Sequence, residues 1–278
     1  MQFLERTGRP RLGFRVDPAK ETCRGRVLLI HGYADHLARF DHVATDWTER
    51  GLTVARFDLT GHGTSGGPRG HIGAFDDYVN DVRDVLAFLE KSPDWTGPGR
   101  PVLFGHSMGA LIAAHTALLV GDRTAGLAMT SPFFDVKKKV PAIQVGVGKI
   151  VSRFSPGLRQ PSGLRGEDVC HDPAVVARYD TDPLRFNHVT VGWFVATEKA
   201  QEELFARAPA LRSPIYCIAA GDDRLVSLDA TRRFFERAGS AEKELDVAPG
   251  LFHEVLNEPD WREHARKLAE RMVLWASR

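Results

Sequence analysis

The chain has 278 residues, of which 43% are hydrophobic and 26% are charged, and its formal net charge is +1. This composition is typical of a globular chain with a sizeable core, and near-neutrality gives no general attraction to nucleic acid. The three cysteines lie far apart without C-x-x-C spacing, which argues against a disulfide framework and a structural zinc site. The N-terminus lacks the apolar stretch of a secretory signal, and no apolar run reaches the roughly 18 residues of a membrane span, so we predict a cytoplasmic protein.

The first predicted elements alternate between strands and helices. The stretch LGFRVDP at residues 12–18 alternates apolar and polar side chains, as a half-buried antiparallel strand does. The continuous apolar run RVLLIHG at 26–32 is typical of a strand that is covered on both faces. We then predict helices over 38–50 and 75–92 with a strand over 53–59 between them, and the second helix has its apolar residues on one face.

The rest of the chain repeats this alternation after one interruption. Strands are predicted at 101–107, 125–132, 213–221 and 243–250, and helices at 108–120, at 228–239 and from about residue 260. Because most of these strands are fully apolar, we predict an α/β fold with a mostly parallel sheet and helices on both faces.

The interruption is the segment 132–188, which is rich in Pro and Gly and has no clear strand. Ligands of such sheets bind at the carboxyl ends of the strands, and long insertions there are usually functional. We therefore predict a core formed by residues 1–131 and 189–278, with 132–188 inserted as a mainly helical cap or lid.

The pentapeptide Gly105-His106-Ser107-Met108-Gly109 is a G-x-S-x-G sequence between a predicted strand and a predicted helix. This context is typical of a nucleophile elbow, in which a tight turn presents the serine at the edge of a sheet. The glycines leave room for neighbouring backbone, and the following helix directs free N–H groups toward the site. The alternative is a serine that only caps the helix.

A serine hydroxyl needs a base to become a nucleophile, and that base needs an acid to orient it. In this type of sheet, the acid and then the histidine follow the serine on loops after later strands. Asp222 and Asp223 follow the strand predicted at 213–221, and His253 follows the last strand. We therefore predict a set of Ser107, one of the two aspartates and His253, with ordinary capping or loop roles as the alternative.

An oxyanion hole is the third element that acyl transfer needs. The strand at 26–32 ends in His31-Gly32, and the loop after it can supply a backbone N–H group. We predict the backbone N–H groups of Tyr33 and Met108 as the two donors.

Five blocks of the chain, in order from about residue 26 to the end, resemble the monoacylglycerol lipase / lysophospholipase group of α/β-hydrolases: HGYADHLARF, FDLTGHGTSGGPRG, GHSMGA, AGDDRLV and LFHEVLNEP. The resemblance implies Ser107 as nucleophile, His253 as base and Asp223, which directly precedes Arg-Leu-Val, as acid. It also implies an α/β-hydrolase fold that cleaves carboxylic esters of monoacylglycerol or lysophospholipid type through an acyl-enzyme, without a metal or an organic cofactor. The chain departs from the family at Asp35, where the family has Glu, and at Ala110, where it has Gly.

The predicted cap is locally basic, although the whole chain is nearly neutral. Between residues 132 and 170 the acids are Asp135, Glu167 and Asp168, and the basic residues are Lys137, Lys138, Lys139, Lys149, Arg153, Arg159 and Arg165. With the apolar stretch at 140–151, this predicts a cap that admits a lipid-like acyl chain and contacts anionic membrane surfaces, with a solvated basic face as the alternative. Four aromatic residues are predicted to line the acyl pocket or else to pack within the cap: Phe133, Phe134, Trp193 and Phe194.

Other functions fit part of this pattern. The same fold and triad serve thioesterases, lactonases, acyltransferases, carbon–carbon bond hydrolases and peptidases, and a non-catalytic binding protein on this fold is a further alternative, which the complete Ser, Asp and His set disfavours. Gly61, Gly63 and Gly66 spell the G-x-G-x-x-G of a dinucleotide site. However, Pro68 and three more glycines intervene before the helix at 75–92, so we expect Gly61, Gly63 and Gly66 to form a tight turn at the carboxyl edge of the sheet.

Overall fold

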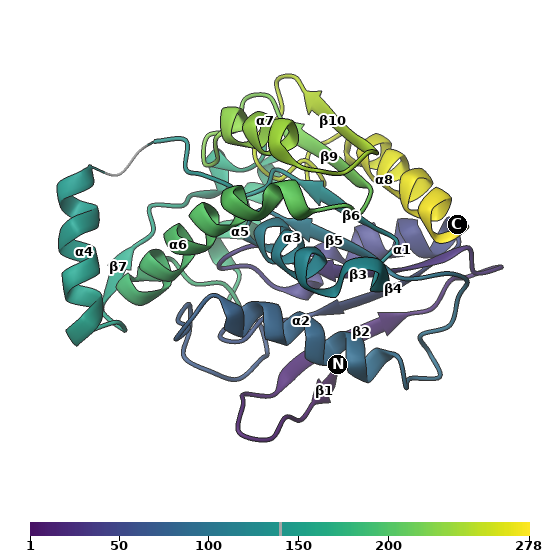
Figure 1. The fold of residues 1–278 in the computed structure, drawn as a ribbon, viewed down its shortest axis with the longest axis horizontal. Coiled ribbons are helices and arrows are strands. Elements are labelled where there is room, and N and C mark those ends of the chain that lie inside the picture. The colour runs from purple at the N-terminus through teal and green to yellow at the C-terminus, as the bar shows by residue number, and fades with distance from the viewer. Residues whose placement is uncertain (139–140) are drawn as a thin grey trace.

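A computed structural model describes residues 1–138 and 141–278, and an eight-stranded sheet forms its centre (Figure 1). In spatial order the strands are β1 (Gln2–Leu4), β2 (Leu12–Asp17), β4 (Leu52–Phe57), β3 (Gly25–Ile30), β5 (Val102–His106), β6 (Gly126–Thr130), β9 (Ile215–Ala220) and β10 (Lys243–Ala248). β2 runs antiparallel to both of its neighbours, and the remaining pairs from β4 to β10 are parallel. The predicted mostly parallel sheet is confirmed, as is the antiparallel strand predicted at 12–18.

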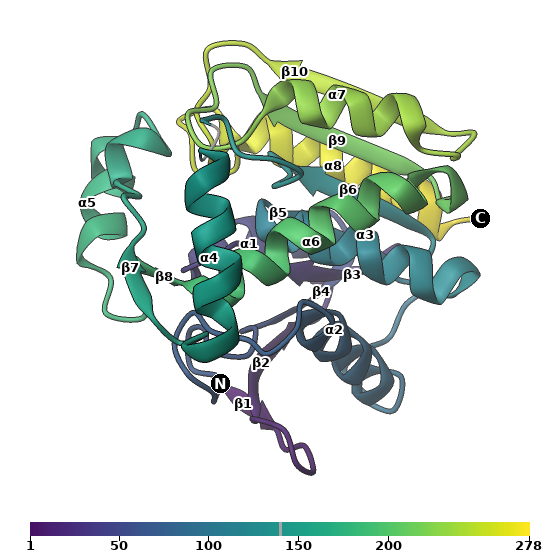
Figure 2. The ribbon, with the colours of Figure 1, turned by 60° about the vertical axis from the view of Figure 1, so that its left-hand side comes forward.

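Helices cover both faces of this sheet (Figures 1 and 2). α1 (Asp41–Glu49) and α8 (Trp261–Ala276) bury their apolar residues on one face. α2 (Asp76–Leu89), α3 (Met108–Val120) and α7 (Leu228–Arg237) do so on the other. The first ten residues of α3 are all buried, and its small side chains let the helix lie close to the centre of the sheet. The two apolar layers hold the strand ends in fixed positions, which is what a site at the sheet edge requires.

The segment predicted as a cap contains α4 (Ala142–Phe154), β7 (Arg159–Pro161) and α5 (Pro173–Thr181). β7 pairs antiparallel with β8 (His188–Thr190), which leads into α6 (Val191–Arg207). The expectation that this segment has no strand is therefore wrong. β7 consists of three exposed residues, Arg-Gln-Pro, so it leaves no apolar alternation in the sequence.

α4 lies at the outer edge of the molecule and packs against α6, where Lys149 Nζ is 2.8 Å from Glu198 Oε2 (Figure 1). α6 in turn contacts α3 in the core. The division at 132–188 stays a prediction, and Lys139 of the predicted basic set lies outside the described residues. Among the helices of the described chain, none combines the length and apolarity needed to cross a membrane.

Candidate active site

Ser107 occupies the sharp turn between β5 and α3. Its φ of 54° is positive, a strained value for a residue with a side chain. The turn is held by the Ser107 N–H, which donates to the carbonyl of Thr130 at 3.0 Å. A Cβ on Gly105 would come within 2.3 Å of the Gly109 carbonyl oxygen, and a Cβ on Gly109 within 2.1 Å of the Ile30 carbonyl oxygen. The two glycines therefore let backbone segments approach closely enough to form the turn.

Asp223 and His253 form a buried pair on the loops after β9 and β10. His253 Nδ1 lies 2.8 Å from Asp223 Oδ2, and the other carboxylate oxygen accepts the N–H groups of Leu225 and Val226 at 2.8 and 2.9 Å. Burial alone would raise the pKa of Asp223, but the imidazole and these N–H groups hold that pKa below its usual value. Burial alone would lower the pKa of His253, but the Asp223 carboxylate raises it above its usual value. The pair thus fixes the ring and favours its protonated form.

The two candidate aspartates differ in their surroundings. Asp223 is 2% exposed and contacts His253. Asp222 is exposed, and its backbone N–H donates to the carbonyl of Leu251 at 3.0 Å. The structure therefore brings Asp223 rather than its neighbour to the histidine.

A cavity of about 320 Å³ is lined by both Ser107 and His253. One part of its wall is apolar and includes Phe133, Trp193 and Phe194. Another part is polar and carries four side chains: Asp35, Tyr179, Arg185 and Glu254. An apolar wall beside convergent polar groups is the usual form of a small-molecule site.

Phe134, the fourth aromatic residue of the prediction, does not line this cavity. It is 1% exposed and packs against Phe234, with ring centroids 4.4 Å apart. Adjacent aromatic residues of the loop after β6 therefore face different environments, since Phe133 lines the cavity and Phe134 contacts α7.

The polar wall depends on one arginine that pairs with two carboxylates. Arg39 Nε lies 3.1 Å from Asp35 Oδ1, and the Arg39 Nη2 group contacts Glu254. Burial alone would raise the pKa of Asp35, but Arg39 holds it below its usual value. Burial keeps the pKa of Glu254 above its usual value. The Arg185 guanidinium, 3.1 Å from the centre of the Tyr179 ring, adds a second cation beside these carboxylates.

The predicted oxyanion donors lie on segments that adjoin the serine. A Cβ on Gly32 would come 3.3 Å from the Cβ of Ser107, so the backbone before Tyr33 lies against the elbow. Met108 is the first residue of α3, where N–H groups have no partner within the helix. The Tyr33 side chain points elsewhere: its hydroxyl lies within hydrogen-bond distance of two carbonyl oxygens, those of Gly70 and His188, at 3.0 and 3.1 Å.

The glycine-rich loop after β4 encloses the side chain of Asp58. A Cβ on Gly63, which has a φ of 48°, would come 2.2 Å from that carboxylate. The Asp58 carboxylate accepts the N–H groups of Leu37 and Thr64 at 2.7 Å each. α2 begins only at Asp76, so the helix N-terminus that would bind a pyrophosphate does not follow these glycines directly.

Glu258 is a buried residue of this region whose role sequence reasoning missed. Its side chain is fully buried and accepts the N–H groups of Phe252 and His171 at 2.8 and 3.0 Å, with His171 Nδ1 2.9 Å away. Phe252 lies between the His171 ring, 3.7 Å away, and the Arg224 guanidinium, 3.8 Å away. These contacts join the loops of Asp223 and His253 to the segment before α5. The available signal was the second of two glutamates, Glu254 and Glu258, that closely follow His253 in the block HEVLNEP.

The described residues hold no cluster of three or more His, Cys, Asp or Glu side chains that could bind a metal ion. The absence of a metal and of a cofactor in the reaction stays a prediction from the sequence.

Both the sequence and the structure match known proteins. The family model described as "Serine aminopeptidase, S33" matches residues 21–260. Monoacylglycerol lipase of Mycolicibacterium smegmatis is 33% identical over 240 residues, which cover 85% of this chain and 84% of that protein. Phospholipase YtpA of Bacillus subtilis is 30% identical over 245 residues, with 87% and 92% covered. The structure of Paleococcus ferrophilus monoacylglycerol lipase matches with a TM-score of 0.86 at 26% identity and covers 95% of this chain and 99% of that chain.

The sheet order, the elbow between β5 and α3 and these structural matches define an α/β-hydrolase. The chain belongs to the family described as serine aminopeptidase S33, because the family model covers most of its length. Within that family it is similar to monoacylglycerol lipases and is a serine hydrolase of the carboxylic ester hydrolase class.

Proposed function

We propose that this enzyme hydrolyses lipid esters with one acyl chain, of monoacylglycerol or lysophospholipid type, through an acyl-enzyme on Ser107. The observation that carries the proposal is the buried Asp223–His253 pair, because its histidine lines the same cavity as the elbow serine. Two relatives support the lipid class, one named as a monoacylglycerol lipase and the other as a phospholipase.

The proposed reaction begins when Ser107 Oγ attacks the ester carbonyl while His253 Nε2 takes its proton. The Asp223 carboxylate stabilises the imidazolium, and the backbone N–H groups of Tyr33 and Met108 stabilise the oxyanion. The C–O bond to the alcohol breaks, and His253 returns the proton to the leaving oxygen. Water then repeats the sequence on the acyl-enzyme, so the products are one alcohol and one carboxylic acid.

The two parts of the cavity wall suit the two parts of such a substrate. In the proposal, the acyl chain lies against Phe133, Trp193 and Phe194, where its burial contributes about 25 cal/mol per Å² of apolar surface. The hydroxyl groups of the alcohol face Asp35 and Glu254, which accept hydrogen bonds.

A panel of substrates tests this proposal: monoacylglycerols, lysophospholipids, simple esters of graded length, acyl thioesters, a lactone and an aminoacyl p-nitroanilide. The expected result is turnover of the single-chain lipid esters above all others, with complete loss in Ser107→Ala. The anilide matters because the family description names an aminopeptidase. Faster cleavage of the anilide than of every ester, or ester turnover that survives Ser107→Ala, overturns the proposal.

We further propose that α4 contacts the lipid surface from which the substrate is taken. One face of this helix exposes four apolar residues at helical spacing: Ile143, Val147, Ile150 and Phe154. Ile143 is 82% and Phe154 83% exposed, and such a stripe in water costs free energy that contact with a bilayer recovers. Exposed cations lie nearby in the sequence, among them Lys138 and Arg153, and suit anionic lipid.

A further inference from the structure

The polar wall of the catalytic cavity carries more cations than carboxylates. Three cationic side chains line the cavity: Lys138, Arg185 and Arg224. Its described lining includes two carboxylates, those of Asp35 and Glu254. Burial raises the pKa of Glu254 above its usual value, and this shift favours the uncharged form of that side chain. The charge of the wall therefore suits an anionic group of a substrate better than a neutral one.

The carboxylates of this wall already have a cationic partner behind it. Arg39 contacts both Asp35 and Glu254, although Arg39 is not part of the described lining. The carboxylate of Asp223 is directed toward His253 and also lies outside this lining. These carboxylates therefore do not act as full counter-charges to the three cations that line the cavity.

Arg185 is the cation of this wall with the most hydrogen-bonding capacity left. It lies between α5 and β8, and its guanidinium is 3.1 Å from the centre of the Tyr179 ring. Its Nη1 donates to the Tyr179 carbonyl at 2.6 Å. Within the part of the chain that the structure describes, this guanidinium has no ion pair and its buried Nε has no hydrogen-bond partner. Because a guanidinium has five N–H donors in a planar fork that matches phosphate oxygens, Arg185 can still bind a phosphate.

The other two cations of the lining differ in mobility. The Arg224 guanidinium is 3.8 Å from the centre of the Phe252 ring and 3.6 Å from a carboxylate oxygen of Asp168. It is therefore held in place and partly neutralised. Lys138 is exposed and has a long, flexible side chain, so its ammonium group can turn toward an anion in the cavity.

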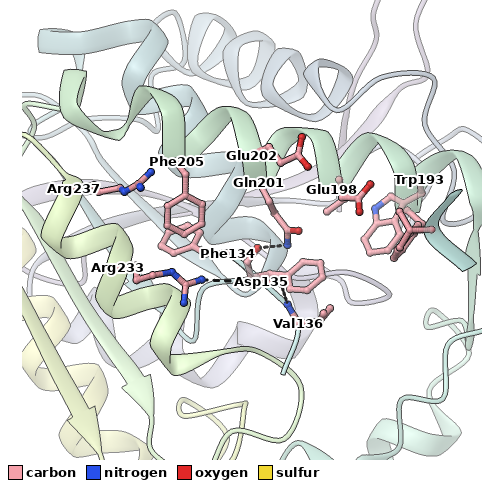
Figure 3. A pocket seen from close by; sticks show the side chains of 14 residues that line it. Phe134, Asp135, Val136, Trp193, Glu198, Gln201, Glu202, Phe205, Arg233 and Arg237 are labelled. Atoms are coloured by element: carbon pink, nitrogen blue, oxygen red, sulfur yellow. Dashed lines mark hydrogen bonds and ion pairs between the residues drawn. The ribbon is translucent and has the colours of Figure 1, made fainter. Parts of the chain in front are cut away.

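A neighbouring cavity of about 360 Å³, between α6 and α7, has the opposite charge balance (Figure 3). Its described lining holds three carboxylates and two guanidinium groups: Asp135, Glu198, Glu202, Arg233 and Arg237. Figure 3 shows Arg233 directed toward Asp135, and their nearest charged atoms are 3.8 Å apart. An excess of cations is therefore a property of the catalytic cavity and not of every hollow in this part of the molecule.

We propose that this enzyme prefers single-chain esters whose head group is an anionic phosphate ester, and that Arg185 and Lys138 bind the phosphate. This inference rests on the proposed ester hydrolysis at Ser107 and selects between the two types of head group named there. The phosphate ester bond stays intact while the carboxylic ester is cleaved with water. The products are therefore a carboxylic acid and a glycerol phosphate. A neutral monoacylglycerol enters the same cavity but forms no ion pair there.

The test is the ratio of kcat/KM for octanoyl glycerol phosphate to that for mono-octanoylglycerol. Both substrates are used below the concentration at which they form micelles, so that attraction to a lipid surface does not contribute. We expect a ratio above one in wild type and a ratio about tenfold lower in Arg185→Gln, because the charged hydrogen bonds to phosphate are lost. Arg185→Lys should recover part of the ratio, since it keeps the charge without the fork. The matched control is Arg178→Gln, which removes the same charge from an exposed position on α5 and should keep the wild-type ratio.

A second variant keeps the test decisive if Arg185→Gln does not fold. Lys138→Gln replaces an exposed side chain, so the core stays intact, and we expect it to lower the ratio about threefold. Lys137→Gln, at the adjacent exposed lysine outside the described lining, is the control. A wild-type ratio below one overturns the inference. An unchanged ratio in folded Arg185→Gln, or in Lys138→Gln if the first variant does not fold, also overturns it. If the proposed function fails instead, the wild-type enzyme cleaves neither ester.

Discussion

The loops that carry Asp223 and His253 differ sharply from α4, the outermost helix. Asp223 and His253 are 2% and 4% exposed, and Glu258 behind them is fully buried with several hydrogen bonds. In α4, by contrast, Ile143 and Phe154 are more than four-fifths exposed. The polar groups of the two loops have their hydrogen-bond partners within the protein and are held in fixed positions. The apolar face of α4, by contrast, is exposed to water without an apolar partner among the described residues. Substitutions in the first region should therefore alter turnover, and substitutions in the second should alter only encounters with lipid.

The largest effect is expected at the proposed nucleophile. Ser107→Ala removes the attacking oxygen and should lower kcat about a million-fold for p-nitrophenyl butyrate, while thermal unfolding shows that the fold persists. Asp223→Asn should cost about 10⁴-fold, because the imidazole loses its orienting carboxylate. Asp222→Asn is the matched control and should stay within twofold of wild type, since its side chain is exposed. A larger loss at 222 than at 223 contradicts the assignment of the acid.

The dependence of kcat/KM on pH should reflect the ionisation of His253 beside Asp223. His253 acts as a base only when neutral, so kcat/KM should fall as the pH drops through its pKa. The Asp223 carboxylate raises that pKa, so the acid limb of wild type should have its midpoint above the ordinary histidine value of about 6.5. In Asp223→Asn the attraction is lost while burial remains, and the midpoint should move to lower pH. A midpoint that does not move would show that another group controls the acid limb.

A smaller effect is expected where Glu258 joins the loops. Glu258→Gln keeps the size of the side chain but removes the charge that accepts two N–H groups and the His171 ring. Loss of a buried hydrogen-bond acceptor lowers the free energy of unfolding by about 1–3 kcal/mol. Thermal unfolding should show this as a Tm lower by several degrees. Because the same loop carries His253, kcat should fall with little change in KM. The control is Glu263→Gln, because Glu263 is exposed at the start of α8. An equal decrease of Tm and kcat in this control would contradict a special role of Glu258.

The sequence predicted the sheet, and it indicated the loops on which Asp223 and His253 lie, because those signals are local. The G-x-S-x-G at Ser107 stands between a strand and a helix within a few residues, and both structural elements are where the pattern put them. The choice of Asp223 over Asp222 depended on the family resemblance, since both follow the same strand. In the structure that choice corresponds to a difference in burial, which sequence alone does not reveal. The catalytic roles of these residues remain predictions.

What the sequence did not reveal are pairings across long separations. Glu258 and His171 lie 87 residues apart, and Arg39 and Glu254 lie 215 apart, so neither pair leaves a periodic pattern. The different environments of Phe133 and Phe134 were hidden for a similar reason, because the direction of each ring is set by partners on α6 and α7. The three-residue strand β7 was missed because its partner, not its own composition, defines it.

The smallest effect on chemistry, and the one that separates the two regions most clearly, is expected from α4. Replacing Ile143 and Phe154 together by Ser removes apolar surface that is already in water, so thermal stability and turnover of p-nitrophenyl butyrate should stay near wild type. Co-sedimentation with phosphatidylglycerol vesicles should fall, as should turnover of ester embedded in those vesicles. Gln144→Ser, an exposed polar position on the same helix, is the control.

Salt separates the two forces that this proposal for α4 combines. Attraction between Lys137, Lys138 or Arg153 and anionic lipid is screened as ionic strength rises, whereas burial of the apolar stripe is not. Vesicle binding by wild type should therefore weaken but persist at high salt, and binding by the double Ser variant should vanish there. If wild type fails to bind at low salt, α4 does not contact lipid. Normal turnover of vesicle ester under that condition would mean that the substrate reaches Ser107 from solution.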